Sequence, residues 1–210
     1  MINVQRFDGQ LDGLEYRIRQ ALVHLGSPIG PQTELELLGP IPIYTLDPFR
    51  VARGATKAPE SPSGWRILVQ HGGMPEALAD IPLSRDGKQL SESVRGQEPA
   101  RALAAALEQA SAYGGGRRKY SLSIVSIPRL FITAVFLAGA PSVFIPTRSG
   151  TAERTAPKAL GRREFMKLVK ARLGEVQRQV GALSRPAGEA LRGTDGPPSV
   201  ANSPPVRTEG

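Results

Sequence analysis

The chain has 210 residues, no cysteine and a formal net charge of +8 at pH 7. This length gives room for one domain of ordinary size and a tail. Without cysteine there can be no disulfide bridge, thiolate metal site or cysteine nucleophile. The first ten residues have no apolar run behind a basic start, which predicts that a secretory signal is absent and that the protein is cytoplasmic.

The excess of positive charge lies toward the C-terminus. Residues 1–147 hold 15 Lys and Arg against 13 Asp and Glu, whereas residues 148–210 hold 12 against 6. Such an asymmetry is typical of proteins that bind an anionic partner, such as nucleic acid, a membrane surface or an acidic protein. The simpler interpretation is a solvated helix face that keeps the protein soluble.

The first third of the chain predicts one helix and one strand. Leucine and isoleucine recur at three- and four-residue steps over about 10–25, which indicates an amphipathic helix. Asp8 can cap its start, and Gly26 marks its end. Residues 41–46 (IPIYTL) are expected to form a strand, and residues 54–64 a Pro/Ser/Gly-rich surface connection.

The middle of the chain predicts a hairpin followed by a helix. Residues 65–70 (WRILVQ) indicate a strand, the following His-Gly-Gly a turn, and residues 77–83 the antiparallel partner strand. Residues 97–112 are rich in alanine and leucine and are strongly helical. The three glycines of residues 114–116 end this helix.

The densest apolar run of the chain is the segment 120–146. Alternation of apolar residues with serine predicts a strand over 120–127. The nearly continuous apolar stretch 130–137 is interpreted as a short buried helix, and residues 143–145 as a second strand. A spanning helix needs about 20 consecutive apolar residues. Since Gly139 and Pro141 interrupt this run, a globular core is expected, without a membrane span.

The last helix is predicted over about 161–183, where apolar residues form a stripe. Gly174 and Gly181 lower its intrinsic stability, so it should need to dock onto the rest of the domain. Residues 184–210 are rich in proline and glycine and poor in large apolar side chains, which predicts a disordered tail.

Together these elements predict an α+β protein with a single domain over residues 1–183 and the disordered Pro/Gly-rich tail over 184–210. The expected sheet is small and mostly antiparallel, with four to five strands and about three helices packed on one side. The strand order stays open, and the segment 120–146 could add a parallel pair.

Motifs for catalysis, cofactors or metals are missing. His24 and His71 lack the spacing of a zinc site. An HGG-type loop at His71 can supply oxyanion-hole amides in α/β hydrolases, but no G-x-S-x-G sequence accompanies it. The GGGRRK sequence of residues 114–119 follows a helix, unlike a phosphate-binding Walker loop. We therefore predict no catalytic, cofactor-binding or metal residue and no cofactor.

Candidate anion or nucleic-acid contacts are the basic residues after the triple glycine and in the last helix. They are Arg117, Arg118, Lys119, Arg162, Arg163, Lys167, Lys170 and Arg178. No platform of exposed aromatic side chains is evident beside them. Binding of nucleic acid through these residues should therefore be driven by phosphate contacts, weak and steeply salt-dependent.

Two further places in the sequence, Trp65 with Arg66 and Arg129, allow either a structural or a functional interpretation. Trp65 opens a strand and is expected to anchor the core, with a ligand-binding role for Trp65 and Arg66 as the alternative. Arg129 lies beside the most apolar segment, where it should either extend to the surface or pair with a carboxylate.

Several segments resemble an uncharacterised family of small soluble bacterial α+β proteins. They are the residues 41–46, 63–68 (SGWRIL), 97–112, 126–130 (SIPRL) and 144–146 (FIP). In the family, a Gly-Trp-Arg strand precedes an alanine-rich helix and an arginine-containing strand ending in Pro-Ala-Leu. This chain has Pro-Arg-Leu instead, and serines replace the strand arginine. The resemblance covers about residues 40–147 and implies a soluble domain with no known activity.

The first functional hypothesis is a non-catalytic interaction or adaptor protein, of unknown pathway, with a protein partner. The alternative is weak, phosphate-driven nucleic-acid binding through the basic C-terminal helix, within residues 158–178. A second alternative is a hydrolase-type enzyme with a site near His71, which a pocket joining His71 to Asp80 or Glu76 would favour.

Overall fold

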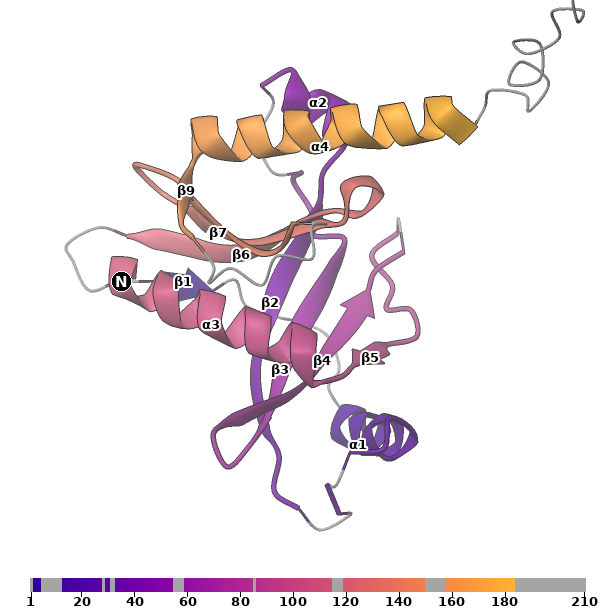
Figure 1. The fold of residues 1–210 in the computed structure, drawn as a ribbon. Coiled ribbons are helices and arrows are strands. Elements are labelled where there is room, and N and C mark those ends of the chain that lie inside the picture. Colours follow the sequence, from indigo (N-terminus) through magenta and orange to yellow (C-terminus); the bar gives the residue numbers. More distant parts are fainter. Residues whose placement is uncertain are drawn as a thin grey trace, which may run out of the picture. The chain divides into compact units, whose positions relative to one another are not determined.

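Figure 1 shows the computed structural model of the chain. The structure describes residues 2–4, 13–27, 29–30, 33–54, 59–84, 86–114, 119–149 and 158–183. The chain divides into two compact units, Met1–Gly174 and Glu175–Gly210. The first unit contains all the described strands, and the described residues of the second continue the last helix.

The described elements are helices and the strands of one sheet. They are β1 (Ile2–Val4), α1 (Leu14–His24), β2 (Glu36–Thr45), α2 (Pro48–Ala52), β3 (Gly64–His71), β4 (Met74–Pro82), β5 (Ser93–Arg95), α3 (Gln97–Gly114), β6 (Tyr120–Ile127), the 3-10 helix η1 (Pro128–Leu130), β7 (Ile132–Ala138), β8 (Val143–Ser149), β9 (Leu160–Gly161) and α4 (Arg162–Leu183). The sheet has nine strands in the order β5-β4-β3-β2-β6-β7-β8-β9, with β1 also beside β6.

The α+β class is confirmed, and so is the mostly antiparallel sheet. The pairs of β6 with β1 and with β2 are parallel, and the other pairs are antiparallel. The sheet is larger than the four to five strands predicted, because strands of two or three residues such as β5 and β9 leave too little periodic pattern to be recognised in the sequence.

The helix predicted over 130–137 is wrong, because this stretch forms η1 and the strand β7. β6, β7 and β8 form an antiparallel meander, so the strands of this segment form no parallel pair with one another; the parallel partners of β6 are β1 and β2. A continuous apolar run is typical both of a buried helix and of a strand buried on two faces. In the part of the chain that the structure describes, no helix is long and apolar enough to cross a membrane.

Helices cover both faces of the sheet, which corrects the prediction that they pack on one side. The apolar stripe of α1, with Ile18 completely buried, packs against Trp65 and Ile67 of β3. α3 packs on the opposite face, where Leu103 lies in one cluster with Leu68 of β3 and other strand residues. Successive side chains of a strand point to opposite faces, so β3 is buried between the two helices.

Helices also cover both faces of the sheet at β7 and β8, with α3 on one face and α4 on the other. Val135 of β7 belongs to the core under α3. Phe136, the next residue, stacks on Phe144 of β8 with ring centroids 4.5 Å apart, and Phe144 stacks on Phe165 of α4 at 4.1 Å. Phe165 and Val169 are completely buried. α4 therefore docks through one stripe, as the sequence predicts for this helix.

Other predictions are confirmed closely. α1, α3 and α4 occupy the three predicted helical ranges, and β3 and β4 form the predicted hairpin. Gly72 and Gly73 both have positive φ, 52° and 74°, as a tight two-residue hairpin turn requires. The predicted cap Asp8 and the tail 184–210 lie outside the described residues.

Gly39 is a position in β2 where the backbone requires glycine. Its φ is 128°, and a Cβ there would lie 2.9 Å from the carbonyl oxygen of Arg66 in β3. We expect Gly39→Ala to lower the free energy of unfolding by about 1–3 kcal/mol through backbone strain and this clash. Urea denaturation measures the loss.

Gly26→Ala is the matched control for that substitution. Gly26 also has a positive φ, 70°, but a Cβ added at this position would have no other atom within 4 Å, so this variant reports the backbone strain alone. Equal losses in the two variants would contradict a clash between Gly39 and the neighbouring strand.

Candidate functional site

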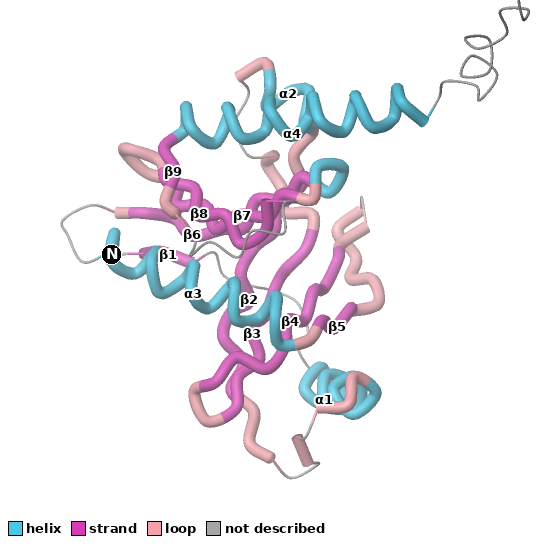
Figure 2. Tube along the Cα trace, in the orientation of Figure 1, coloured by secondary structure: helices cyan, strands magenta, loops and turns pink. Residues whose placement is uncertain are grey.

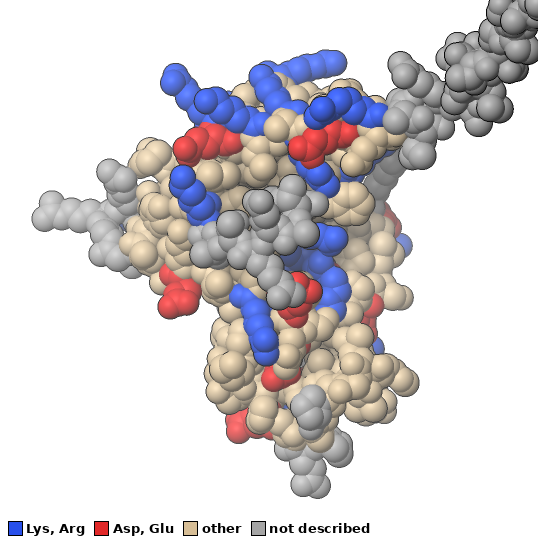
Figure 3. All heavy atoms as spheres, viewed as in Figure 1, with Lys and Arg blue, Asp and Glu red and all other residues tan. Residues whose placement is uncertain are grey.

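The basic residues predicted in the last helix lie on the exposed side of α4. Phe165 and Val169 face the sheet, while Arg163, Lys167 and Lys170 are exposed. These three follow one another at four- and three-residue steps, so they share one side of the helix. Figure 3 shows Lys and Arg atoms gathered over α4, with Asp and Glu atoms among them.

Figure 2 shows α2 beside α4, and the residue Gly54 that follows α2 contacts the beginning of α4, because its carbonyl oxygen accepts a hydrogen bond of 2.8 Å from Nη2 of Arg162. Asp47 caps α2 by accepting from the backbone N–H of Phe49 at 2.7 Å. Phe49 is 43% exposed. We define the α2–α4 surface as six exposed residues of these two helices, one aromatic and five basic; they are Phe49, Arg50, Arg162, Arg163, Lys167 and Lys170.

The remaining predicted anion contacts are not brought together with this surface by any described interaction. Arg117 and Arg118 lie outside the described residues. Lys119 is exposed at the start of β6, and Arg178 is exposed in the part of α4 that belongs to the second unit.

A second concentration of positive charge lies on the face of the sheet that α3 covers. Arg66 is 5% exposed, and its Nε and Nη2 atoms donate to both carboxylate oxygens of Asp80 at 2.6 and 2.9 Å. Arg95 donates from Nη2 to Oδ2 of the same carboxylate at 2.5 Å. The register explains this arrangement, since Arg66 pairs with Asp80 across β3 and β4, and Arg95 pairs with Leu78 of β4.

Arg148 of β8 lies on the same face as this group. It pairs with Thr133, two residues before Val135, which belongs to the core under α3. In Figure 1, β6–β8 run across the direction of β2–β4, so the sheet curves and strands distant in the sheet order approach one another. We call Arg66, Asp80, Arg95 and Arg148 the arginine cluster.

The electrostatics of the cluster are those of a partly buried site with excess positive charge. Burial lowers the pKa of Arg95 most, and the charge of Arg66 lowers it further; Asp80 raises it, and Arg148 lowers it again. The Nε atom of Arg95 is buried and has no hydrogen-bond acceptor. Two guanidinium groups therefore share one carboxylate, the charge of Arg148 acts on Arg95 without a described bond to Asp80, and one buried donor of Arg95 is left over.

An exposed aromatic ring adjoins the cluster. Phe131 is 55% exposed, and the guanidinium carbon of Arg148 lies 5.5 Å from its ring centroid, which is within the range of a cation–π contact. Phe131 has φ 54° and is the only non-glycine residue with positive φ in the described ranges. Such strained conformations concentrate at functional sites.

The sequence pointed to Arg66 as a possible ligand contact, but it did not predict that Arg66 lies in a cluster with Asp80, Arg95 and Arg148. A charged residue inside the otherwise apolar strand β3 was the available signal, whereas Arg95 and Arg148 carry none. Trp65 is 6% exposed and lies in the core under α1, which confirms it as a core anchor. Arg129 is exposed, so it extends to the surface.

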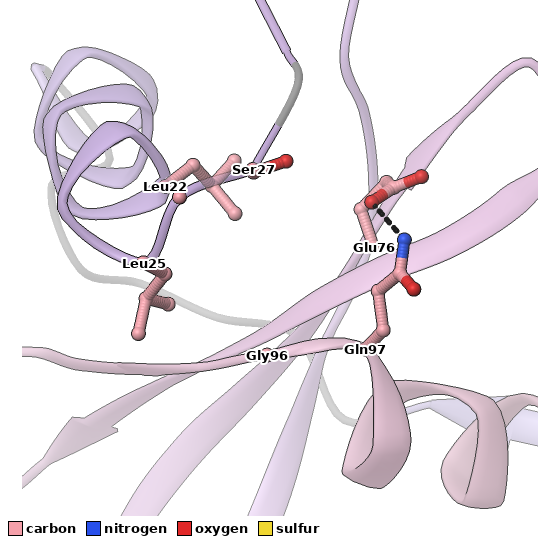
Figure 4. A pocket seen from close by; sticks show the side chains of 7 residues that line it. Leu22, Leu25, Ser27, Glu76, Gly96 and Gln97 are labelled. Carbon is pink, nitrogen blue, oxygen red and sulfur yellow. Dashed lines mark hydrogen bonds between the residues drawn. The ribbon is translucent and has the colours of Figure 1, made fainter.

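His71 is exposed at the end of β3, with Nδ1 3.2 Å from the carbonyl oxygen of Glu34. The cavity shown in Figure 4 has a volume of about 300 Å³; its walls are Leu22, Leu25, Gly26, Ser27, Glu76, Gly96 and Gln97. Gln97 donates to Glu76 at 2.7 Å on one side of the cavity, and Leu22, Leu25 and Ser27 lie on the other side. His71 does not line this cavity, and the carboxylate of Asp80 is bonded to Arg66 and Arg95. The pocket that would join His71 to Asp80 or Glu76 is therefore not described, and the hydrolase hypothesis near His71 stays a prediction.

No cluster of three or more His, Cys, Asp or Glu suited to a metal ion occurs among the described residues. No protein-family model matches the chain, and comparisons with curated proteins and with solved structures found no significant similarity. The family resemblance drawn from the sequence stays a prediction.

Proposed function

We propose that this protein is a non-catalytic interaction protein that binds an acidic surface of a partner protein through the α2–α4 surface. The observation that carries this proposal is the division of α4 into two sides. Buried Phe165 and Val169 hold the helix on the sheet, while Arg163, Lys167 and Lys170 are exposed on the other side.

A docked helix is a favourable platform for recognition. Its backbone is already ordered, so binding loses less conformational entropy than the ordering of a free segment would. The first unit's part of α4, residues 162–174, holds five Lys and Arg against one Glu. Opposite charges on a partner would raise the association rate and orient the encounter.

The acidic residue among the cations of α4 favours a protein partner over nucleic acid, and the other residue types suit a protein interface. Arginine and exposed aromatic side chains such as Phe49 are enriched at the centres of protein interfaces. Glu164 interrupts the basic side of α4 and would repel phosphates, whereas a protein surface can offer it a cation. The complementary surface should therefore combine carboxylates with an apolar patch for Phe49.

Nucleic-acid binding is the second candidate, because Arg163, Lys167 and Lys170 form a line of exposed cations. At a rise of about 1.5 Å per residue they lie roughly 4.5–6 Å apart along the helix, which lets neighbouring cations contact successive phosphates. Such binding would lose affinity steeply as salt concentration rises.

Affinity purification of the tagged full chain from its native host, with and without nuclease, tests the proposal. The test variant is Arg163→Glu/Lys167→Glu/Lys170→Glu. Its control is Lys88→Glu/Arg101→Glu/Arg129→Glu, which changes the net charge equally at exposed sites elsewhere. We expect a stoichiometric protein that survives nuclease, is retained by the control and is lost from the test variant.

Two results would overturn this assignment. Co-purified nucleic acid that disappears at high salt, without a nuclease-resistant protein, would favour the second candidate. A partner retained equally by both triple variants would show that α4 is not the contact.

A further inference from the structure

The arginine cluster holds more positive charge than its protein neighbours balance. Arg66 and Arg95 share the carboxylate of Asp80, and Arg148 contacts the ring of Phe131. No other carboxylate forms an ion pair with these arginines among the described residues. Arg148 is exposed and the side chain of Arg95 is 37% exposed, so an anion can reach these two arginines, and the excess positive charge favours an anionic ligand.

The hydrogen bonds of the cluster also leave one donor of Arg95 without an acceptor. Arg95 uses Nη2 to bind Asp80, while its Nε is buried with no acceptor. A guanidinium group can bind an anion through two parallel N–H groups. Asp80 of β4 holds Arg66 and Arg95 in fixed positions on the two strands that flank β4, so these guanidinium groups need little further ordering.

We propose that the arginine cluster binds the phosphate group of a nucleotide whose base stacks on the exposed ring of Phe131. Three guanidinium groups and one carboxylate leave two uncompensated positive charges. A phosphate monoester carries a charge of about −1.5 to −2 at pH 7, which matches this excess. A free nucleotide and a single-stranded nucleic acid would offer the same chemistry.

Phe131 is the reason for choosing a nucleotide over a simple anion. Its positive φ and its 55% exposure place an aromatic ring at the surface, beside the guanidinium of Arg148. Proteins that bind unpaired bases stack them on aromatic rings next to a basic groove. This site shares no residue with the α2–α4 surface and thus goes beyond the proposed function.

Calorimetric titration of the full chain with inorganic phosphate, adenosine monophosphate, adenosine and a short single-stranded oligonucleotide tests the proposal. We expect adenosine monophosphate to bind more tightly than phosphate, and adenosine not to bind. Arg95→Gln and Arg148→Gln should each weaken nucleotide binding about tenfold by removing charge-assisted hydrogen bonds. Arg101→Gln, at an exposed position of α3, should leave it unchanged.

Variants at Phe131 test the stacking contact separately. Phe131→Leu should weaken the nucleotide but not inorganic phosphate, and Phe131→Tyr should retain affinity for both. Thermal unfolding of every variant checks that the fold persists. Oligonucleotide binding that needs Arg95 and Phe131, without binding of the mononucleotide, would identify single-stranded nucleic acid as the source.

Three results would overturn the proposal. They are the absence of binding of all four ligands to the unaltered chain, equal effects of Arg101→Gln and Arg95→Gln, and oligonucleotide binding lost only in the α4 triple variant. The last result would assign nucleic acid to α4 and would contradict the protein-partner proposal as well. If the affinity purification found no protein partner, the α2–α4 proposal would fail while nucleotide binding at the arginine cluster could still be measured. The failure of one proposal is therefore distinguishable from the failure of the other.

Discussion

Replacing Phe165 with alanine is expected to lower the free energy of unfolding by about 3–5 kcal/mol, as for other completely buried phenylalanines. Phe165 is 0% exposed and stacks on Phe144, which stacks in turn on Phe136. The substitution removes apolar burial and leaves a cavity between α4 and the sheet. Since helices of this kind derive most of their stability from packing, α4 should also lose helicity.

Denaturant unfolding followed by circular dichroism measures the effect of Phe165→Ala. Arg163→Ala is the control, because Arg163 lies in the same turn but is exposed, and exposed substitutions usually change stability by less than about 0.5 kcal/mol. A similar small loss for both variants would contradict the docking of α4 through its aromatic stripe.

Replacing Asp80 with asparagine should lower the free energy of unfolding by about 3 kcal/mol, because it breaks a buried ion pair from one side. The side chain of Arg66 is 6% exposed and that of Asp80 is 19% exposed. Without the carboxylate, Arg66 stays charged in a desolvated place beside Arg95. Chemical denaturation at constant ionic strength measures this loss.

A double variant separates the charge from the packing. Arg66→Met/Asp80→Asn removes the buried positive charge as well, and it should recover most of the stability that Asp80→Asn loses. Asp86→Asn is the comparison at an exposed ion pair, that of Asp86 with Lys88, and should change stability little. If the double variant were less stable than Asp80→Asn, an uncompensated charge on Arg66 would not be the cause.

Local patterns predicted the helices well. The apolar steps of α1 and α4 and the alanine-rich composition of α3 are properties of 11–22 neighbouring residues. The β3–β4 hairpin was also predictable, because Gly72 and Gly73 supply the positive φ angles that its turn needs. The basic residues of α4 were placed correctly on its exposed side, because the stripe that contains Phe165 and Val169 leaves the other side to solvent.

The error at β7 has a physical cause. Val135 packs under α3, whereas Phe136 packs toward α4, so residues on both faces of the strand are apolar. The alternation that identifies a strand then disappears, and the pattern resembles that of a buried helix. Only the knowledge that two helices enclose this part of the sheet distinguishes the alternatives.

The sequence by itself determined the α+β class, the three long helices, the central hairpin and the basic side of α4, because each depends on residues close together in the chain. The tertiary structure alone decided the size of the sheet, its covering on both faces and the arginine cluster. Arg66 and Asp80 are 14 residues apart in the chain and meet through the register of β3 and β4. The register of β8 places Arg148 on the same face of the sheet, and the curvature of the sheet brings it near them. Register and curvature arise from the packing of the whole sheet, which no local pattern encodes.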